Sequence, residues 1–337
     1  MADGDSTTSD AEGLRLFDTA WMMATQASEK EIDDYLYHLA QRGFDGAWFT
    51  VLPMPWSDRE SQRYNIVNDG SGSPAYTIED DHFILTDGYI TRLNHILAKS
   101  RELGLRHGLV VAWANEYLCL SSPRLDAANA RILGEQIAGS LDHAGAVDYW
   151  VFGGDQGSSG NGSCLDDIEH ASTWAALRDG LQSEGAHQDV AYHSAPIGWI
   201  VSLDRAMTHI DEPWLDVFAP QTGHGAGASK VSSDIGDSIS SSNGRPVFAG
   251  ELTYFMFDCF DLSQDCPGTI GSTETIYGEA TAAIGAGAAG LLYGDWDRWM
   301  WCTPLWPASD RSSPCDGSIY NTFNTAGEDA FFKAIDQ

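Results

Sequence analysis

Short apolar segments alternate with helical segments along almost the whole chain, and this alternation is what most constrains the fold. Eight segments rich in β-branched and aromatic residues are expected as strands: 14–17, 47–52, 107–113, 149–152, 190–193, 215–219, 246–252 and 290–293. Helix signals lie between them, such as the capping box Ser28-Glu-Lys-Glu31 with Gly43 at the predicted helix end. Strict alternation predicts a parallel sheet with right-handed crossovers. Eight units within 337 residues predict an α/β fold, the closed (β/α)8 TIM barrel.

The chain is expected to form a single domain over residues 13–337. Residues 1–12 are polar and acidic with no apolar signal core, and they are predicted to be a disordered lead-in. Residues 54–86 are predicted to form a long polar loop insertion without periodicity. A loop of that length in a compact domain is usually functional.

The charge balance limits the partners that the protein can bind. Its 49 acidic and 18 basic residues give a formal net charge of -31. So acidic a surface repels anionic polymers, which excludes binding to a nucleic-acid backbone. The sequence contains no run of 18 apolar residues, so no membrane-spanning segment is expected.

Six cysteines bear on the compartment in which the protein works. They form no Cys-x-x-Cys pair and no histidine clusters beside them, so no zinc site is expected. Two close pairs, Cys259 with Cys266 and Cys302 with Cys315, predict local disulfides, which leaves Cys119 to pair with Cys164. With the glycosylation sequon at 161–163, the even number favours a secreted protein. The alternative is a cytoplasmic enzyme with free buried thiols.

Two predicted strands end in a single carboxylate. The fourth runs through Gly153 and Gly154 into Asp155, and Glu251 is the only charge in the seventh. In parallel barrels the active site lies at the carboxyl ends of the strands, so both are candidate catalytic residues. The alternative for Asp155 is that it caps a turn.

The other polar and aromatic residues at the predicted strand ends are candidates for substrate binding: Asp18, Trp21, Trp56, Asn115, Glu116, Gln156, His193, Gln221, His224, Tyr254, Asp295, Trp296 and Arg298. Two carboxylates facing each other across a pocket lined by tryptophans are typical of a glycoside hydrolase active site. Aromatic faces stack on sugars, and the amides and imidazoles hydrogen-bond to hydroxyls. The expected partner is thus an oligo- or polysaccharide, with no cofactor and no metal. His193 and His224 could instead be hydrogen-bonded rim residues.

Four motifs in order resemble one known family. The stretches Phe17-Asp-Thr-Ala-Trp21, Gly153-Gly-Asp155, Gln221-Thr-Gly-His224 and Gly250-Glu251 are similar to those of the apiosidase-like glycoside hydrolases, family 140. The resemblance runs from about residue 14 to 300. It implies a (β/α)8 catalytic domain that acts on plant cell-wall side chains. It also implies a catalytic aspartate at Asp155 and a catalytic glutamate at Glu251.

These observations predict a secreted glycosidase that retains anomeric configuration. Asp155 is expected to be the general acid/base, kept protonated by an apolar setting, and Glu251 the nucleophile, because the longer Glu side chain can reach the anomeric carbon. Glu116 is the rival acid. One alternative is a carbohydrate-binding barrel that has lost catalysis. Another is a polysaccharide lyase in which a local cation such as Arg298 neutralises a uronate.

Overall fold

The structure, a computed structural model, describes residues 13–53, 73–121, 123–154, 170–198, 201–256, 271–299, 301 and 318–337. Eight parallel strands form its main sheet, in the order β8-β7-β6-β5-β2-β1-β10-β9. Their bounds are β1 Arg15–Thr19, β2 Gly46–Thr50, β5 His107–Val110, β6 Val147–Gly153, β7 Asp189–His193, β8 Val217–Ala219, β9 Phe248–Ala249 and β10 Gly290–Tyr293. Parallel bridges from Phe218 to Val247 and from Gln221 to Glu251 join the two edge strands. The predicted (β/α)8 barrel is therefore confirmed.

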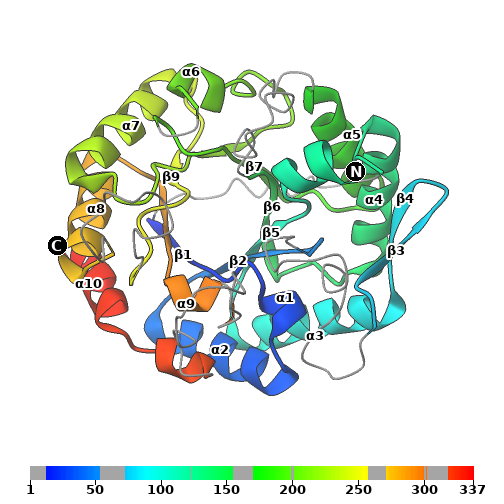
Figure 1. Cartoon of the computed structure of the whole chain (residues 1–337), viewed down its shortest axis with the longest axis horizontal. Helices are drawn as coiled ribbons and strands as arrows, with labels where there is room; N and C mark the ends of the chain where they lie inside the picture. The colour runs from blue at the N-terminus through cyan, green and yellow to red at the C-terminus, as the bar shows by residue number, and fades with distance from the viewer. Residues whose placement is uncertain are drawn as a thin grey trace, which may run out of the picture.

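Most helices surround the strands as a ring in which the chain colour runs in order, and α1 and α9 lie inside that ring (Figure 1). Their bounds are α1 Met23–Gln26, α2 Glu29–Arg42, α3 Asp87–Leu103, α4 Ala127–Ser140, α5 Ala171–Ser183, α6 Leu203–Ala206, α7 Gly227–Ser241, α8 Thr273–Ala286, α9 Trp296–Trp299 and α10 Ala326–Ile335. The predicted capping box of α2 is present, and Gly43 ends this helix with φ +91°. No helix in the described ranges is long and apolar enough to cross a membrane.

Part of the predicted loop insertion is a β-hairpin, so the prediction of a polar loop without periodicity is wrong for residues 76–85, and residues 54–72 lie outside the described residues. Strands β3 (Tyr76–Glu79) and β4 (His82–Leu85) pair antiparallel, and Asp80 and Asp81 form the turn with φ of 49° and 64°. The ring of Phe83 packs 5.5 Å from that of Tyr117. The alternating apolar residues on either side of Asp80-Asp81 are a hairpin signal in the sequence. The polar composition of the surrounding segment outweighed that signal in the prediction.

Aromatic side chains fill the interior of the barrel. The ring of Phe17 on β1 contacts those of Trp48, Tyr149 and Phe248, on β2, β6 and β9, at centroid distances of 6.1, 5.8 and 6.2 Å. All four are buried. The strands thus surround a packed core, and the polar residues that follow their carboxyl ends lie above it.

Only one of the six cysteines lies within the described residues, so the predicted disulfide pairings are not tested. Cys119 is not a free thiol, and the other five cysteines lie outside the described residues. The three predicted pairings therefore stay predictions, as does secretion. The lead-in at 1–12 and the sequon also lie outside the described residues.

His107, at the start of β5, is buried in its neutral form. Its Nδ1 accepts a hydrogen bond from Ala47 N at 2.9 Å, and its Nε2 lies 2.6 Å from the Ser100 hydroxyl, which itself donates to Ile96 O. Nε2 must therefore carry the proton. Burial lowers the pKa of His107 to about 4. A second proton, on Nδ1, would displace the hydrogen bond from the Ala47 amide, although the Ala47 carbonyl oxygen, 3.2 Å away, could accept it and partly offsets the effect of burial.

We expect this histidine to make folding sensitive to acid. The unfolded chain takes up a proton near pH 6.5, whereas the folded protein resists doing so until about pH 4, so stability falls as the pH decreases through that range. In urea unfolding, His107→Gln should lessen the loss of unfolding free energy between pH 7.5 and pH 4 by about 3 kcal/mol. His187→Gln, at an exposed position, controls for loss of a histidine. An unchanged pH dependence in His107→Gln would contradict the assignment.

Candidate active site

Glu251 lies at the mouth of the barrel, directly after β9, the seventh barrel strand. Its backbone bridges to Gln221, and its carbonyl accepts hydrogen bonds from the amide and hydroxyl of Thr222 at 3.2 and 3.1 Å. Gly250 makes this close approach possible, because a Cβ there would lie 2.4 Å from the carbonyl oxygen of Ala219. The Gly250-Glu251 pair therefore fixes where the carboxylate emerges.

Two histidines hold the Glu251 carboxylate. Nε2 of His224 lies 2.9 Å from Oε1, and Nε2 of His193 lies 3.4 Å from Oε2. Burial acts to raise the pKa of Glu251, but hydrogen bonds from His193 and His224 outweigh it and lower the pKa to about 2. The side chain is 9% exposed. Glu251 is thus a nearly buried carboxylate whose ionised form is favoured by its two histidine partners.

His193 has two competing partners for one nitrogen. Its Nδ1 lies 3.1 Å from the carbonyl oxygen of Ala219, which can only accept, so Nδ1 carries a proton. Its Nε2 lies 3.1 Å from the amide nitrogen of Gln221, on the side away from Ala219. The second partner of Nε2 is Oε2 of Glu251, at 3.4 Å. The predicted residues His193, Gln221 and His224 therefore meet at Glu251.

Aromatic residues line the same end of the barrel. The indole nitrogen of Trp21 donates to the Tyr254 hydroxyl at 2.8 Å, and the Tyr254 ring lies 4.5 Å from that of His224. Trp296 is half-buried, with its ring 6.3 Å from Tyr254 and 6.4 Å from His224. Trp113, absent from the predicted set, packs 5.4 Å from Trp21. A partly exposed indole near His224, which itself hydrogen-bonds to Glu251, suits a sugar ring.

The other predicted carboxylate cannot be placed. Asp155, Gln156 and Trp56 lie outside the described residues. Gly154 lies at the end of β6, the fourth barrel strand, with φ +107°, and a Cβ there would lie 2.6 Å from the Trp113 ring. Glycine is required at this position, so the motif before Asp155 has a steric cause.

Asn115 and Glu116 do not end a strand as predicted. The third barrel strand stops at Val110, and both residues begin a π-helix, Asn115–Leu120. The amide of Asn115 donates to the Gly154 carbonyl at 3.3 Å, so this turn starts beside the residue that precedes Asp155. Both side chains are buried, Glu116 with 4% exposure. π-Helical turns are frequent at functional sites, and here one brings the rival acid close to Gly154.

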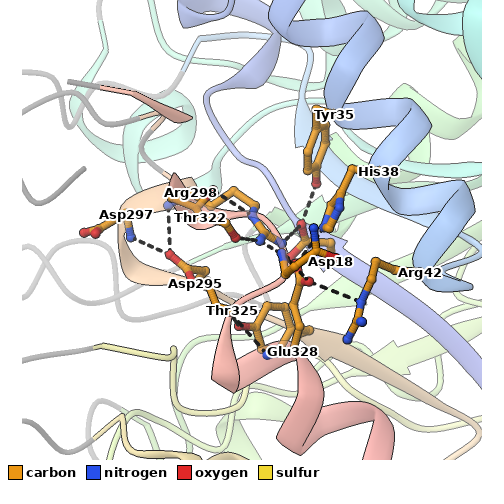
Figure 2. Close-up of polar contacts among 12 residues, drawn as sticks. Asp18, Tyr35, His38, Arg42, Asp295, Asp297, Arg298, Thr322, Thr325 and Glu328 are labelled. Carbon is orange, nitrogen blue, oxygen red and sulfur yellow. Dashed lines mark hydrogen bonds and ion pairs between the residues drawn. The ribbon is translucent and has the colours of Figure 1, made fainter. Parts of the chain in front are cut away.

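Asp18 and Arg298 belong to a buried ion network rather than to the exposed surface of the site. Figure 2 shows Arg298 between Asp18 and Glu328. Asp18 Oδ2 accepts from Arg298 Nη1 at 2.8 Å and from the Tyr35 hydroxyl at 2.7 Å. Asp18 and Arg298 have no exposed surface, so their predicted contact with substrate stays a prediction that burial disfavours. The network joins β1, α9 and α10.

Asp295 lies at the edge of this network, immediately before Trp296. Its Oδ1 accepts from the backbone amides of Asp297 and Arg298 at 3.1 and 3.3 Å, which caps α9. Burial raises the pKa of Asp295 to about 7, although Arg298 opposes the shift. Its 3% exposure gives a sugar little access, and its predicted substrate contact also stays a prediction.

Within the described ranges, no group of three or more His, Cys, Asp or Glu side chains could hold a metal ion. The expectation that the protein uses neither metal nor cofactor stays a prediction.

An eight-stranded barrel with this mouth has the fold of the (β/α)8 glycoside hydrolases. The chain belongs to the apiosidase-like family, because the model of the apiosidase-like catalytic domain matches residues 7–328. No curated protein is significantly similar in sequence.

Solved structures share the fold at low sequence identity. A glycoside hydrolase family 5 structure from Bacteroides vulgatus ATCC 8482 is 16% identical, with a TM-score of 0.70 over 94% of this chain and 65% of that chain. The endo-1,4-beta-mannanase from Rhizomucor miehei is 9% identical, with a TM-score of 0.63 over 99% of this chain and 97% of that chain. This chain thus spans slightly less than two thirds of the first protein and almost all of the second.

Proposed function

We propose that the protein is a retaining glycoside hydrolase in which Glu251 is the nucleophile and Asp155 the general acid/base. The observation that carries the proposal is the ionised Glu251 carboxylate, held by His193 and His224 at the barrel mouth. A nucleophile needs a negative charge on a carboxylate of fixed direction. The two imidazoles supply both conditions.

In the proposed reaction Glu251 attacks the anomeric carbon while Asp155 protonates the departing glycosidic oxygen. The bond between the anomeric carbon and that oxygen breaks, and an ester to Glu251 forms. A water molecule, deprotonated by Asp155, then attacks the same carbon and releases the carboxylate. Trp296, which is half-buried, would stack on the sugar beside the bond that is cleaved.

The substrate is proposed to be a plant or microbial polysaccharide. Plant cell-wall side chains are the first candidates, because the family resemblance implies them and the chain carries the apiosidase-like domain. The family 5 and mannanase neighbours share the same fold. We further propose that the protein acts outside the cytoplasm, which the even cysteine number and the absence of a free thiol at Cys119 support.

The two alternatives are weaker. A lyase needs a cation that meets the uronate, and Arg298 is fully buried between Asp18 and Glu328. A barrel that only binds sugars has no need for a carboxylate whose pKa is held near 2 against the effect of burial.

A polysaccharide panel tests the proposed function. Purified protein is incubated with plant and microbial polysaccharides, and the released sugars are analysed beside those from Glu251→Gln. We expect the wild type to release sugar from at least one substrate and the variant to release none. Binding without release would favour the sugar-binding alternative, and an unsaturated product would favour the lyase.

A further inference from the structure

Glu279 is a buried carboxylate on α8 with 1% exposure. Its Oε2 accepts a hydrogen bond from Thr253 N at 2.8 Å. Its Oε1 accepts from the Thr253 hydroxyl and from Gly227 N, both at 2.9 Å. None of the described cationic side chains forms an ion pair with it, so these three donors compensate its burial.

The three donors come from the two loops that form the candidate site. Thr253 follows Glu251 by two residues, and Gly227 follows His224 by three. The Thr253 hydroxyl, which donates to Glu279, also accepts from Gly225 N at 2.7 Å. The loop of the carboxylate and the loop of its histidine are therefore joined twice, through Glu279 and through Thr253.

Glu279 also fixes the start of α7. The side chain of the N-cap residue, Ala226, makes no capping hydrogen bond, and Gly227 is the first residue of the helix. Glu279 supplies the missing acceptor from the neighbouring helix, where the positive end of the α7 dipole favours a negative charge. The 15-residue helix α7 thereby anchors the His224 loop.

We propose that Glu279 is a positioning residue that holds His224 in hydrogen-bonding contact with Glu251. The proposal rests on the proposed function for its effect on catalysis. Among the described residues, Glu279 hydrogen-bonds to Thr253 and Gly227 and not to Glu251 itself. It acts by fixing the distance of 2.9 Å between His224 Nε2 and Glu251 Oε1.

Three nearly isosteric variants test this role. Glu279→Gln retains one acceptor oxygen and places an amide donor against the Thr253 or Gly227 amide. Thr253→Val removes the shared hydroxyl, and Thr253→Ser keeps it. We expect Glu279→Gln and Thr253→Val each to lower kcat roughly 10- to 100-fold with KM changed less than about threefold, since the two loops shift but Trp296, on α9, stays in place. Thr253→Ser should retain kcat within about threefold.

The matched control is Glu274→Gln, the same substitution at an exposed position of α8. It should leave kcat unchanged. Equal kcat values for wild type and Glu279→Gln well below the melting temperature would overturn the proposal and leave Glu279 a purely structural residue. If Glu279→Gln does not fold, the comparison of Thr253→Val with Thr253→Ser decides in the same way.

A second measurement does not depend on catalysis. The imidazole proton of His224 between Nε2 and Glu251 should give a downfield NMR signal, assigned by its loss in His224→Gln. We expect that signal to shift or broaden in Glu279→Gln and to stay in place in Glu274→Gln. An unmoved signal would overturn the positioning role even in an active enzyme. A moved signal in a protein without glycosidase activity would instead refute the proposed function alone.

Discussion

Glu251→Gln is expected to lower turnover by about 10⁴-fold or more while the protein stays folded, because a neutral amide cannot form the glycosyl ester. The substitution is nearly isosteric, and glutamine still offers an oxygen to His224 at the position of Oε1. The backbone contacts of Glu251 with Gln221 and Thr222 are unchanged. The loss should therefore appear in kcat rather than in the melting temperature.

The measurement is kcat on the substrate found in the polysaccharide panel, with circular dichroism and thermal melting of the same samples. Glu184→Gln, at an exposed position following α5, is the matched control and should behave like the wild type. Turnover by Glu251→Gln within tenfold of wild type would show that Glu251 is not the nucleophile.

Asp155→Asn is expected to lower turnover by roughly 10²- to 10⁴-fold, the usual contribution of a general acid. Glu116→Gln should have a much smaller effect. Both residues are candidates for the general acid, and the turn that begins with Asn115 and Glu116 starts where Asn115 N donates to the carbonyl of Gly154. The activities of the Asp155→Asn and Glu116→Gln variants distinguish the two candidates for the general acid.

Comparing substrates with different leaving groups distinguishes Asp155 from Glu116 as the general acid. A substrate with an acidic phenol as its leaving group needs little protonation, so Asp155→Asn should lose far less activity on it than on the natural glycoside. Glu116→Gln should show no such difference. If Glu116→Gln showed that dependence on the leaving group and Asp155→Asn did not, the acid would be Glu116.

The barrel could be predicted from the sequence because its strands and helices carry strong local signals. The run 149–152 is apolar and β-rich, and Ser28 with Glu31 marks the start of α2 as a capping box. Eight such units in order leave few topologies open. The same order placed Glu251 at the end of the seventh barrel strand, and in the structure it lies two residues beyond the end of β9.

Burial of polar residues could not be predicted in the same way. Asp18 and Arg298 follow the pattern of exposed residues at strand ends, yet they are 280 positions apart and pair inside the protein. That contact depends on α10, whose Glu328 completes the network (Figure 2). The residues next to Asp18 or Arg298 in the sequence do not indicate a partner that is 280 positions away.

The sequence contains a weaker indication that Glu279 is important. It lies three residues after Ile276 and four before Ala283, on the face of α8 that the helical period assigns to the core. A carboxylate at a core position needs a partner and is therefore a candidate for a structural or functional role. Which loops supply its donors follows only from the fold.

The central claim is that Glu251 attacks the anomeric carbon directly, and proton NMR of the first product formed tests it most directly. Two displacements at that carbon, one by Glu251 and one by water, return its original configuration, whereas a single attack by water inverts it. Spectra collected before mutarotation should show a product with the same anomeric configuration as the substrate. An inverted first product would contradict the account and make Glu251 a general base.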